Sequence, residues 1–87
     1  MPSYRAIEVV CSCGAPLARY QKGGTGRLVK MFFHKILTDR AGVFVTDPPR
    51  KLDEEILCPQ CSRRVATVRV VRGQYAAKVN QGAVRVK

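Results

Sequence analysis

The sequence lacks features that several common classes of protein need. No apolar run approaches the roughly 20 residues of a membrane-spanning helix, so we expect no membrane partner. Residues 1–5 lack the basic start and apolar core of a secretory signal, which predicts a reducing, cytoplasmic location. The 87 residues suit one domain, 1–87, but so short a chain buries only roughly 60 to 65% of its unfolded surface. We therefore expect a cross-link or a metal to supplement the core.

Acidic residues are scarce, and their distribution is uneven. Sixteen Lys and Arg against six Asp and Glu give a formal charge of +10. Residues 56–87 carry seven basic side chains and no acidic one. An excess of this size favours nucleic acid, or an acidic protein, as the partner.

Groups suited to acid–base catalysis are also few. The acidic run 53–55 is expected to be a solvated edge beside the second pair of cysteines. The one histidine, His34, lies between Phe33 and Lys35, where we expect a polar position on a strand. We therefore expect that the protein is not an enzyme.

Valine-rich and aromatic runs separated by short glycine turns predict a mainly β fold. Strands are expected at 4–10, 17–21, 28–37, 43–46, 65–72, 75–79 and 83–86. The run 28–37 is expected to pair back on 17–21 as a hairpin, although its apolar spacing also fits a helix. Pro48 and Pro49 exclude a helix or a central strand after residue 46. The fold predicted is a small antiparallel sheet or a partly open barrel.

Four cysteines occur in two tight pairs, Cys11 with Cys13 and Cys58 with Cys61. In a reducing compartment, paired cysteines hold metal more often than they form structural disulfides. Two such pairs, brought together by a fold, supply the tetrahedral set of sulfurs that Zn²⁺ prefers. We therefore expect a four-cysteine site with Zn²⁺ as the cofactor. The alternative is two disulfides, Cys11 to Cys58 and Cys13 to Cys61, because a bond within the first pair would be strained.

Both pairs resemble the cysteine knuckles of zinc-ribbon proteins. Gly14 directly follows Cys13, as glycine often does in these knuckles, and residues 58–61 read Cys-Pro-Gln-Cys with the usual spacing. The resemblance implies a structural zinc ion between two antiparallel hairpins. Two departures are a single residue inside the first pair and Ser62 where glycine is common. Four thiolates close the coordination shell, so the resemblance implies no catalytic role for the metal.

Two basic surfaces are candidates for nucleic-acid contact. Lys22 and Arg27 flank the glycine-rich segment 23–26, whose backbone amides could approach a phosphate. That segment lacks the Gly-Lys-Thr ending of a P-loop, and a plain hairpin tip is the alternative. In the C-terminal third, Tyr75, together with Tyr20, could stack bases beside a second basic set: Arg63, Arg64, Arg69, Arg72 and Lys78.

These features favour two classes of function. The first is a small basic zinc-binding module that binds nucleic acid, RNA rather than DNA, as an accessory factor in translation or transcription. The second is a structural or protein-interaction domain whose positive surface docks to an acidic protein. The salt dependence of binding separates them, because each neutralised phosphate releases counterions.

Overall fold

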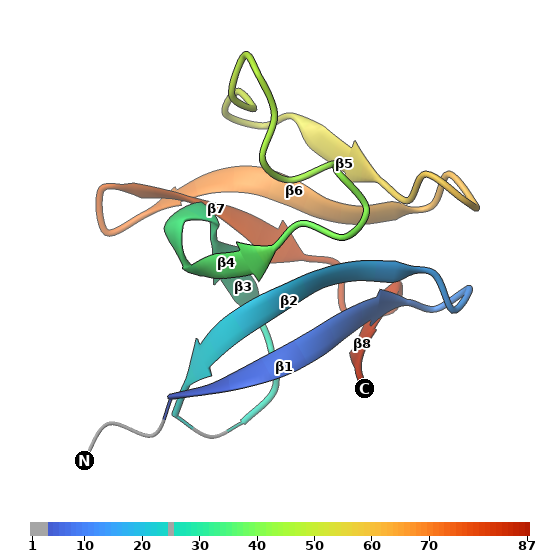
Figure 1. The fold of residues 1–87 in the computed structure, drawn as a ribbon. Helices are drawn as coiled ribbons and strands as arrows, with labels where there is room; N and C mark the ends of the chain where they lie inside the picture. Colours follow the sequence, from blue (N-terminus) through green and yellow to red (C-terminus); the bar gives the residue numbers. More distant parts are fainter. Residues whose placement is uncertain (1–3, 25) are drawn as a thin grey trace.

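The computed structural model describes residues 4–24 and 26–87, which form two four-stranded antiparallel sheets. The first sheet has the order β4-β2-β1-β8 and the second the order β3-β7-β6-β5. Within the described residues neither sheet closes into a barrel, and the mainly β prediction is confirmed (Figure 1). The elements in chain order are β1 (Tyr4–Cys11), β2 (Pro16–Gly23), β3 (Lys30–Phe32), the 3-10 turn η1 (Phe33–Lys35), β4 (Ile36–Thr38), β5 (Glu55–Leu57), β6 (Arg64–Val71), β7 (Gln74–Val79) and β8 (Val84–Val86).

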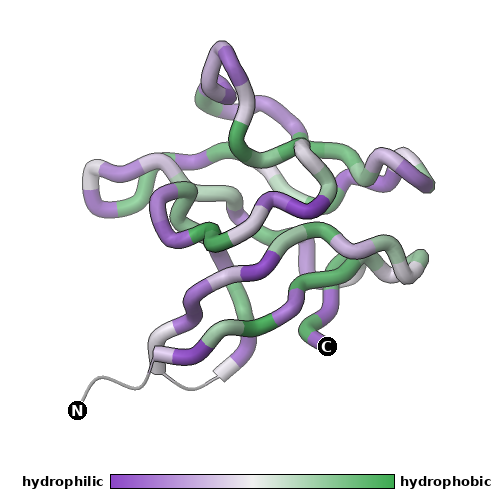
Figure 2. The backbone as a smooth tube through the Cα atoms, in the orientation of Figure 1, coloured by the Kyte–Doolittle hydropathy of each residue, from purple (hydrophilic) through white to green (hydrophobic). Residues whose placement is uncertain are grey.

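The core lies between the facing sides of the two sheets. In β1, the buried residues Ile7, Val9 and Cys11 alternate with more exposed ones, as the period of two in a half-buried strand requires. Leu17 from β2 and Met31 from β3 join the same buried cluster, so both sheets contribute to it. Figure 2 shows the corresponding change between hydrophobic and hydrophilic segments along the strands. No helical segment in the described part of the chain has the length and apolar character needed to cross a membrane.

The strand predicted at 43–46 is wrong, because a side chain takes the hydrogen bonds that a strand partner would receive. The carboxylate of Asp39 accepts hydrogen bonds at 2.8 to 3.2 Å from successive backbone N–H groups, those of Gly42, Val43, Phe44 and Val45. This capping holds the segment as a loop that places Phe44 in the core. As the two prolines predict, residues 47–50 contain neither helix nor strand.

The run 28–37 is divided between the two sheets and is not the single strand predicted. Its first part, β3, pairs with β7, and only the part that continues into β4 pairs with β2. The turn η1 separates the two parts, so the expected hairpin with β2 forms only near Ile36 and Thr38. No residue of η1 is buried, and Phe33 packs only partly against the core cluster, so the chain passes from one sheet to the other at the margin of the core. The prediction of one continuous strand is therefore wrong.

Candidate functional site

The four cysteines come together at one end of the stacked sheets. Cys11 ends β1 and Cys13 lies in the turn before β2, whereas Cys58 and Cys61 lie in the turn between β5 and β6. All four Sγ atoms lie within 4.8 Å of one another, with Cys11–Cys61 at 3.6 Å and Cys13–Cys58 at 3.7 Å. A tetrahedral ion with metal–sulfur bonds of about 2.3 Å requires sulfurs about 3.8 Å apart. The cluster therefore has the geometry to hold one metal ion.

The sulfurs are too far apart to be bonded to one another. An S–S bond is about 2.05 Å long, and all four cysteines are free in the structure. The sulfurs in contact at 3.6 and 3.7 Å belong to Cys11 with Cys61 and to Cys13 with Cys58, which are not the pairs expected for disulfides. The arrangement thus favours a shared ligand over two cross-links.

The first knuckle is a tight turn closed by backbone hydrogen bonds. The N–H of Gly14 donates to the carbonyl of Cys11 at 2.8 Å, and the N–H of Cys11 donates to the carbonyl of Ala15 at 2.9 Å. Gly14 has φ of +97°, in the left-handed region that glycine adopts without steric cost. The glycine after Cys13 is therefore required by the backbone that aims both sulfurs at one point.

The second knuckle repeats the same hydrogen-bond pattern with a serine in place of the glycine. Ser62 N–H donates to the carbonyl of Cys58 at 2.9 Å, and Cys58 N–H donates to the carbonyl of Arg63 at 2.8 Å. Ser62 has φ of +64°, which costs a residue with a Cβ about 1 kcal/mol or more. In addition, the N–H of Gln60 donates to the Sγ of Cys58 at 3.4 Å. The two pairs thus adopt one geometry despite their different spacing.

The neighbouring sulfurs shift the pKa values of Cys11 and Cys13 in opposite directions. Burial raises the pKa of Cys11, but hydrogen bonds from the Cys13 backbone and from the other three cysteine side chains lower it to about 7. A backbone hydrogen bond from Ala15 lowers the pKa of Cys13, yet burial and the three neighbouring sulfurs raise it to about 12. Four thiolates repel one another unless a cation lies between them. A divalent ion would therefore favour the ionised form of all four.

Two further contacts hold the knuckles in place. The N–H of Ser12 donates to the carbonyl of Ala83 at 2.8 Å, which ties the first knuckle to the chain before β8. The Arg63 guanidinium donates to Oγ of Ser12 at 2.8 Å and so connects the second knuckle to the first. Arg63, which the sequence places among the nucleic-acid contacts, is thus engaged in joining the two turns.

Two other arginines from the predicted basic surface are paired with acidic side chains. Arg64 forms an ion pair with Glu55 at 2.9 Å across β6 and β5, and Arg69 pairs with Asp53. Exposed pairs of this kind contribute little to stability. They do lower the local positive potential, so this surface attracts an anion less than its count of arginines indicates.

Of the remaining residues of that set, Lys78 lines one recess with Arg64 and Arg69, whereas Arg72 does not. Arg72 lies at the turn between β6 and β7 with φ of +52°, and Lys78 lies opposite Lys30 in the β7–β3 pairing. Tyr20 is buried, and its hydroxyl accepts a hydrogen bond from the N–H of Phe32 at 3.0 Å. Tyr20 therefore belongs to the core and cannot stack a base.

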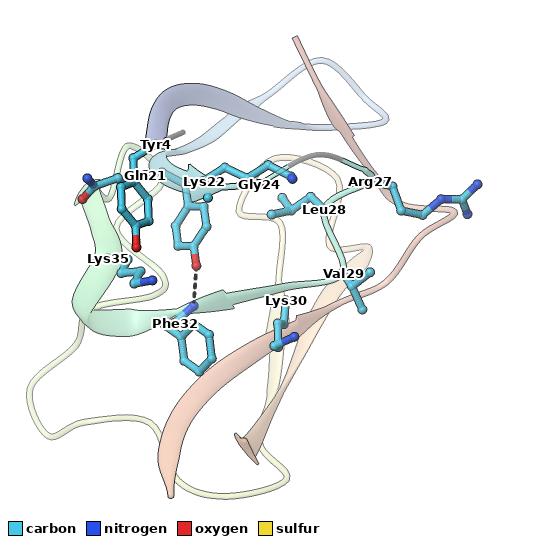
Figure 3. A pocket seen from close by; sticks show the side chains of 12 residues that line it. Tyr4, Gln21, Lys22, Gly24, Arg27, Leu28, Val29, Lys30, Phe32 and Lys35 are labelled. Atoms are coloured by element: carbon cyan, nitrogen blue, oxygen red, sulfur yellow. Dashed lines mark hydrogen bonds between the residues drawn. The ribbon is translucent and has the colours of Figure 1, made fainter. Parts of the chain in front are cut away.

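The other predicted pair, Lys22 and Arg27, lines a pocket of about 560 Å³ together with Lys30 and Lys35. No acidic residue lines this pocket, and no ion pair found among the described residues includes any of the four cations. Figure 3 shows Lys35 near the Tyr4 ring and Lys30 near Phe32, with Lys22 on the opposite side of the pocket. We call this set of residues the cationic pocket.

Aromatic rings and ammonium groups alternate along one wall of the cationic pocket. The Nζ of Lys35 lies 5.4 Å from the ring centroid of Tyr4 and 5.7 Å from that of Phe32, and the Nζ of Lys30 lies 5.9 Å from Phe32. Tyr4 lies opposite Gly23 in the β1–β2 pairing, and its ring covers the glycine so closely that an added Cβ would be 2.8 Å from Cε1 of the ring. Gly23 therefore allows the tyrosine to lie against the strand, with about half of its surface exposed.

Sequence analysis did not include Lys30, Lys35, Tyr4 or Phe32 in a site. The spacing of Lys30 and Phe32 contained a usable signal, because residues two apart on a strand share a face. Lys35 had no such signal, since it reaches the pocket from the 3-10 turn that links the two sheets. Its position depends on the crossing between sheets, which the local sequence does not reveal.

Comparisons with known proteins do not assign the chain to a family. No protein-family model, no curated protein and no solved structure matches it. The functional argument therefore depends on the cysteine cluster and the cationic pocket.

Proposed function

We propose that the cysteine cluster holds a structural Zn²⁺ ion in the manner of a zinc ribbon. Thiolate sulfur suits zinc, and four protein ligands in a tetrahedral set characterise structural rather than catalytic zinc sites. Each sheet supplies one knuckle, so the ion would join the two sheets at this end of the molecule. We propose no enzymatic activity, because such a site leaves no coordination position for a substrate.

We propose further that the protein binds single-stranded nucleic acid through the cationic pocket. The observation that carries this proposal is a pocket lined by four cations and, among the described residues, by no acid, in which Lys30 and Lys35 lie beside two aromatic rings that are at least partly exposed. Phosphates neutralise such cations, and bases stack on such rings, each stacked base contributing about 1 to 3 kcal/mol. The acid-paired arginines of β6 lack both properties.

RNA is proposed over DNA for a structural reason. Duplex DNA is read by an element that enters a groove, most often a helix. The only helical element among the described residues is the three-residue 3-10 turn η1. RNA-binding modules instead take unstacked bases of single strands and loops onto exposed rings. An accessory role in translation or transcription is consistent with a small module of this kind.

The binding proposal is tested by fluorescence anisotropy with single-stranded RNA of about eight nucleotides, a length within the usual site size. Tyr4→Leu should weaken binding about tenfold or more, since it removes one stacking ring. Tyr75→Leu is the matched control, because Tyr75 is exposed to a similar degree, 48% against 53% for Tyr4, but lies outside the cationic pocket. Equal affinities for the two variants would refute the proposal.

A second test uses charge. Removing Lys30 and Lys35 together by substitution with alanine should flatten the dependence of log K on log salt, since each lost phosphate contact changes the slope by about 0.7 for single strands. The matched double variant Arg64→Ala/Arg69→Ala removes two cations that have acidic partners and should leave the slope nearly unchanged.

A docking function for an acidic protein is the second candidate, and one surface favours it. A cavity of about 650 Å³ is lined by Val45, Leu52 and Tyr75, all exposed, and by the cations Arg50 and Lys51. Apolar side chains rimmed by charge are typical of protein-interaction sites. If the protein binds no single strand even at low salt, this becomes the preferred function.

A further inference from the structure

The side of the β1–β2 hairpin that faces the core carries apolar side chains near the cysteine cluster and two cations at its far end. Paired positions on this face run away from the cysteine cluster in the following order: Val9 with Ala18, Ile7 with Tyr20, and Arg5 with Lys22. The first two pairs are buried core residues. The third places two cations directly opposite each other, an arrangement that destabilises a sheet.

Lys22 is unusual among the charged residues because only 8% of its surface is exposed. No ion pair or side-chain hydrogen bond found in the described part of the chain involves its ammonium group. No buried side-chain nitrogen lacks a partner among the described residues, so the 8% exposure of Lys22 describes the residue as a whole and not an ammonium group sealed in the core. The side chain borders two cavities, so a ligand in either could supply the missing negative charge.

The second of these cavities is smaller and strongly basic. It has a volume of about 250 Å³, and the cations that line it are Arg5, Lys22, Arg27 and Arg85, with no acidic residue. Val79 of β7 also lines it, so residues of both sheets bound the recess. In Figure 3 Arg27 extends away from Lys30 and Lys35 of the cationic pocket. None of the four cations belongs to an ion pair among the described residues.

We propose that this recess binds the terminal phosphate monoester of a nucleic-acid strand. A terminal monoester carries nearly two negative charges at neutral pH, whereas an internal diester carries one, so the monoester better matches four cations. Arginine guanidinium groups bind such oxygens with paired, charge-assisted hydrogen bonds. A strand end also has chain on one side only, which suits a recess between two sheets.

The choice of ligand rests on the proposed function, because the recess adjoins the cationic pocket. The two share Lys22, Arg27 and Leu28 in their linings. A strand whose end phosphate lies in the recess can therefore place its neighbouring base against the pocket that contains Tyr4 and Phe32. The inference adds that the protein recognises a strand end.

The test compares single-stranded RNAs of about eight nucleotides that differ only at one end, with the full chain loaded with zinc. One strand has a 5′-phosphate, one a 5′-hydroxyl and one a 3′-phosphate, each labelled at the other end. We expect one of the phosphorylated strands to bind about tenfold tighter than the unphosphorylated one. Which strand is preferred identifies the end that the recess takes.

Variants assign that preference to the recess. Arg5→Met and Arg85→Met should each reduce the affinity ratio of phosphorylated to unphosphorylated strand toward one. Lys30→Met should weaken both strands and leave the ratio unchanged, because Lys30 lines only the cationic pocket. Arg64→Met, at an acid-paired position, should change neither affinity nor ratio. Because each ratio is measured within one variant, a partial loss of folded protein does not alter it.

The two proposals fail in different ways. If strands bind but the end phosphate has no effect, or if the ratio survives in both Arg5→Met and Arg85→Met, the end-binding inference is wrong and the proposed function stands. If no strand binds, the proposed function is wrong, and the end-binding inference is then wrong as well.

Discussion

The β1–β2 hairpin has opposite electrostatic designs at its two ends. At one end, Cys11 and Cys13 meet the cysteines of the second sheet within 4.8 Å, and one divalent cation offsets half of the negative charge of four thiolates. At the other end, Arg5 and Lys22 face each other without an acidic partner in the described structure. Each end brings like charges together, and each requires an ion of opposite sign.

The difference lies in what kind of ion satisfies each end. The cysteine end is closed by hydrogen bonds within and between its knuckles, which suits a resident ion that stabilises the fold. The cationic end opens into two cavities, which suits an exchangeable anion. Unfavourable repulsion in the free protein becomes binding free energy when such a ligand arrives. We therefore interpret one end as structural and the other as functional.

The largest expected effect is on the cysteine end. Complete removal of metal by a chelator, or Cys58→Ser, should unfold the chain, because apparent binding free energies of structural zinc are about 10 to 16 kcal/mol in small finger peptides. Circular dichroism melting together with measured metal content checks this. Ser12→Ala removes no ligand and only the exposed hydrogen bond from Arg63, so it should lower the melting temperature far less than the loss of a cysteine does. An unaltered melting curve after full chelation would contradict a structural ion.

The cationic end should respond in the opposite sense. Lys22→Met replaces a cation opposite Arg5 by an apolar side chain and should raise the free energy of unfolding by about 1 kcal/mol. The same variant should bind single-stranded RNA more weakly. Urea denaturation at low salt measures the first effect, and Arg19→Met, at a position paired with Glu8, provides a control without stabilisation. If Lys22→Met lowers the free energy of unfolding, repulsion between Arg5 and Lys22 does not destabilise the free protein.

A smaller effect separates the two knuckles. Ser62→Gly should stabilise the protein by about 0.5 to 1 kcal/mol, since Ser62 adopts φ of +64° and glycine does so without strain. Gly14→Ser, at the equivalent position with φ of +97°, should destabilise it. Denaturation midpoints of the two variants, measured with metal bound, check the pair. If both changes shift stability in the same direction, the knuckles are not equivalent.

The smallest effect on stability should come from Gly23. In Gly23→Ala the new methyl group would meet the Tyr4 ring, and because this ring ends a mobile side chain it can move aside at little cost. We expect melting to be nearly unchanged and RNA affinity to fall. Chemical shifts of the tyrosine ring should report the displacement. Retained affinity together with a displaced ring would exclude Tyr4 as a stacking platform.

The sequence predicted three of the longest strands and the cysteine cluster. β1, β6 and β7 lie close to their expected limits, because β-favouring runs bounded by turn residues are a local property; burial alternates in β1, whereas neighbouring residues are buried together in β6 and β7. The segment 43–46 has β-favouring residues but lacks a strand partner, since the Asp39 carboxylate binds its N–H groups. A side chain that replaces a neighbouring strand leaves no periodic signal.

The basic residues illustrate the same limit. Sequence alone placed Arg69 and Lys22 in two equivalent candidate surfaces. Asp53 then neutralises Arg69, whereas Lys22 lies on the inner face opposite another cation. A count of charges in the sequence cannot distinguish these two residues. Whether a cation has an acidic partner depends on which strand or loop lies next to its side chain.

By itself, the sequence determined the two cysteine knuckles, the net charge and the strand-rich character of the protein. These follow from spacing, composition and local period, which act between near neighbours in the chain. Only the tertiary structure decided that each sheet supplies one knuckle, that Lys35 joins Tyr4 and Phe32, and that four cations line one recess with no acid among the described residues. Charges and ligands act through space over a few ångströms, so their partners are known only once distant segments have packed together.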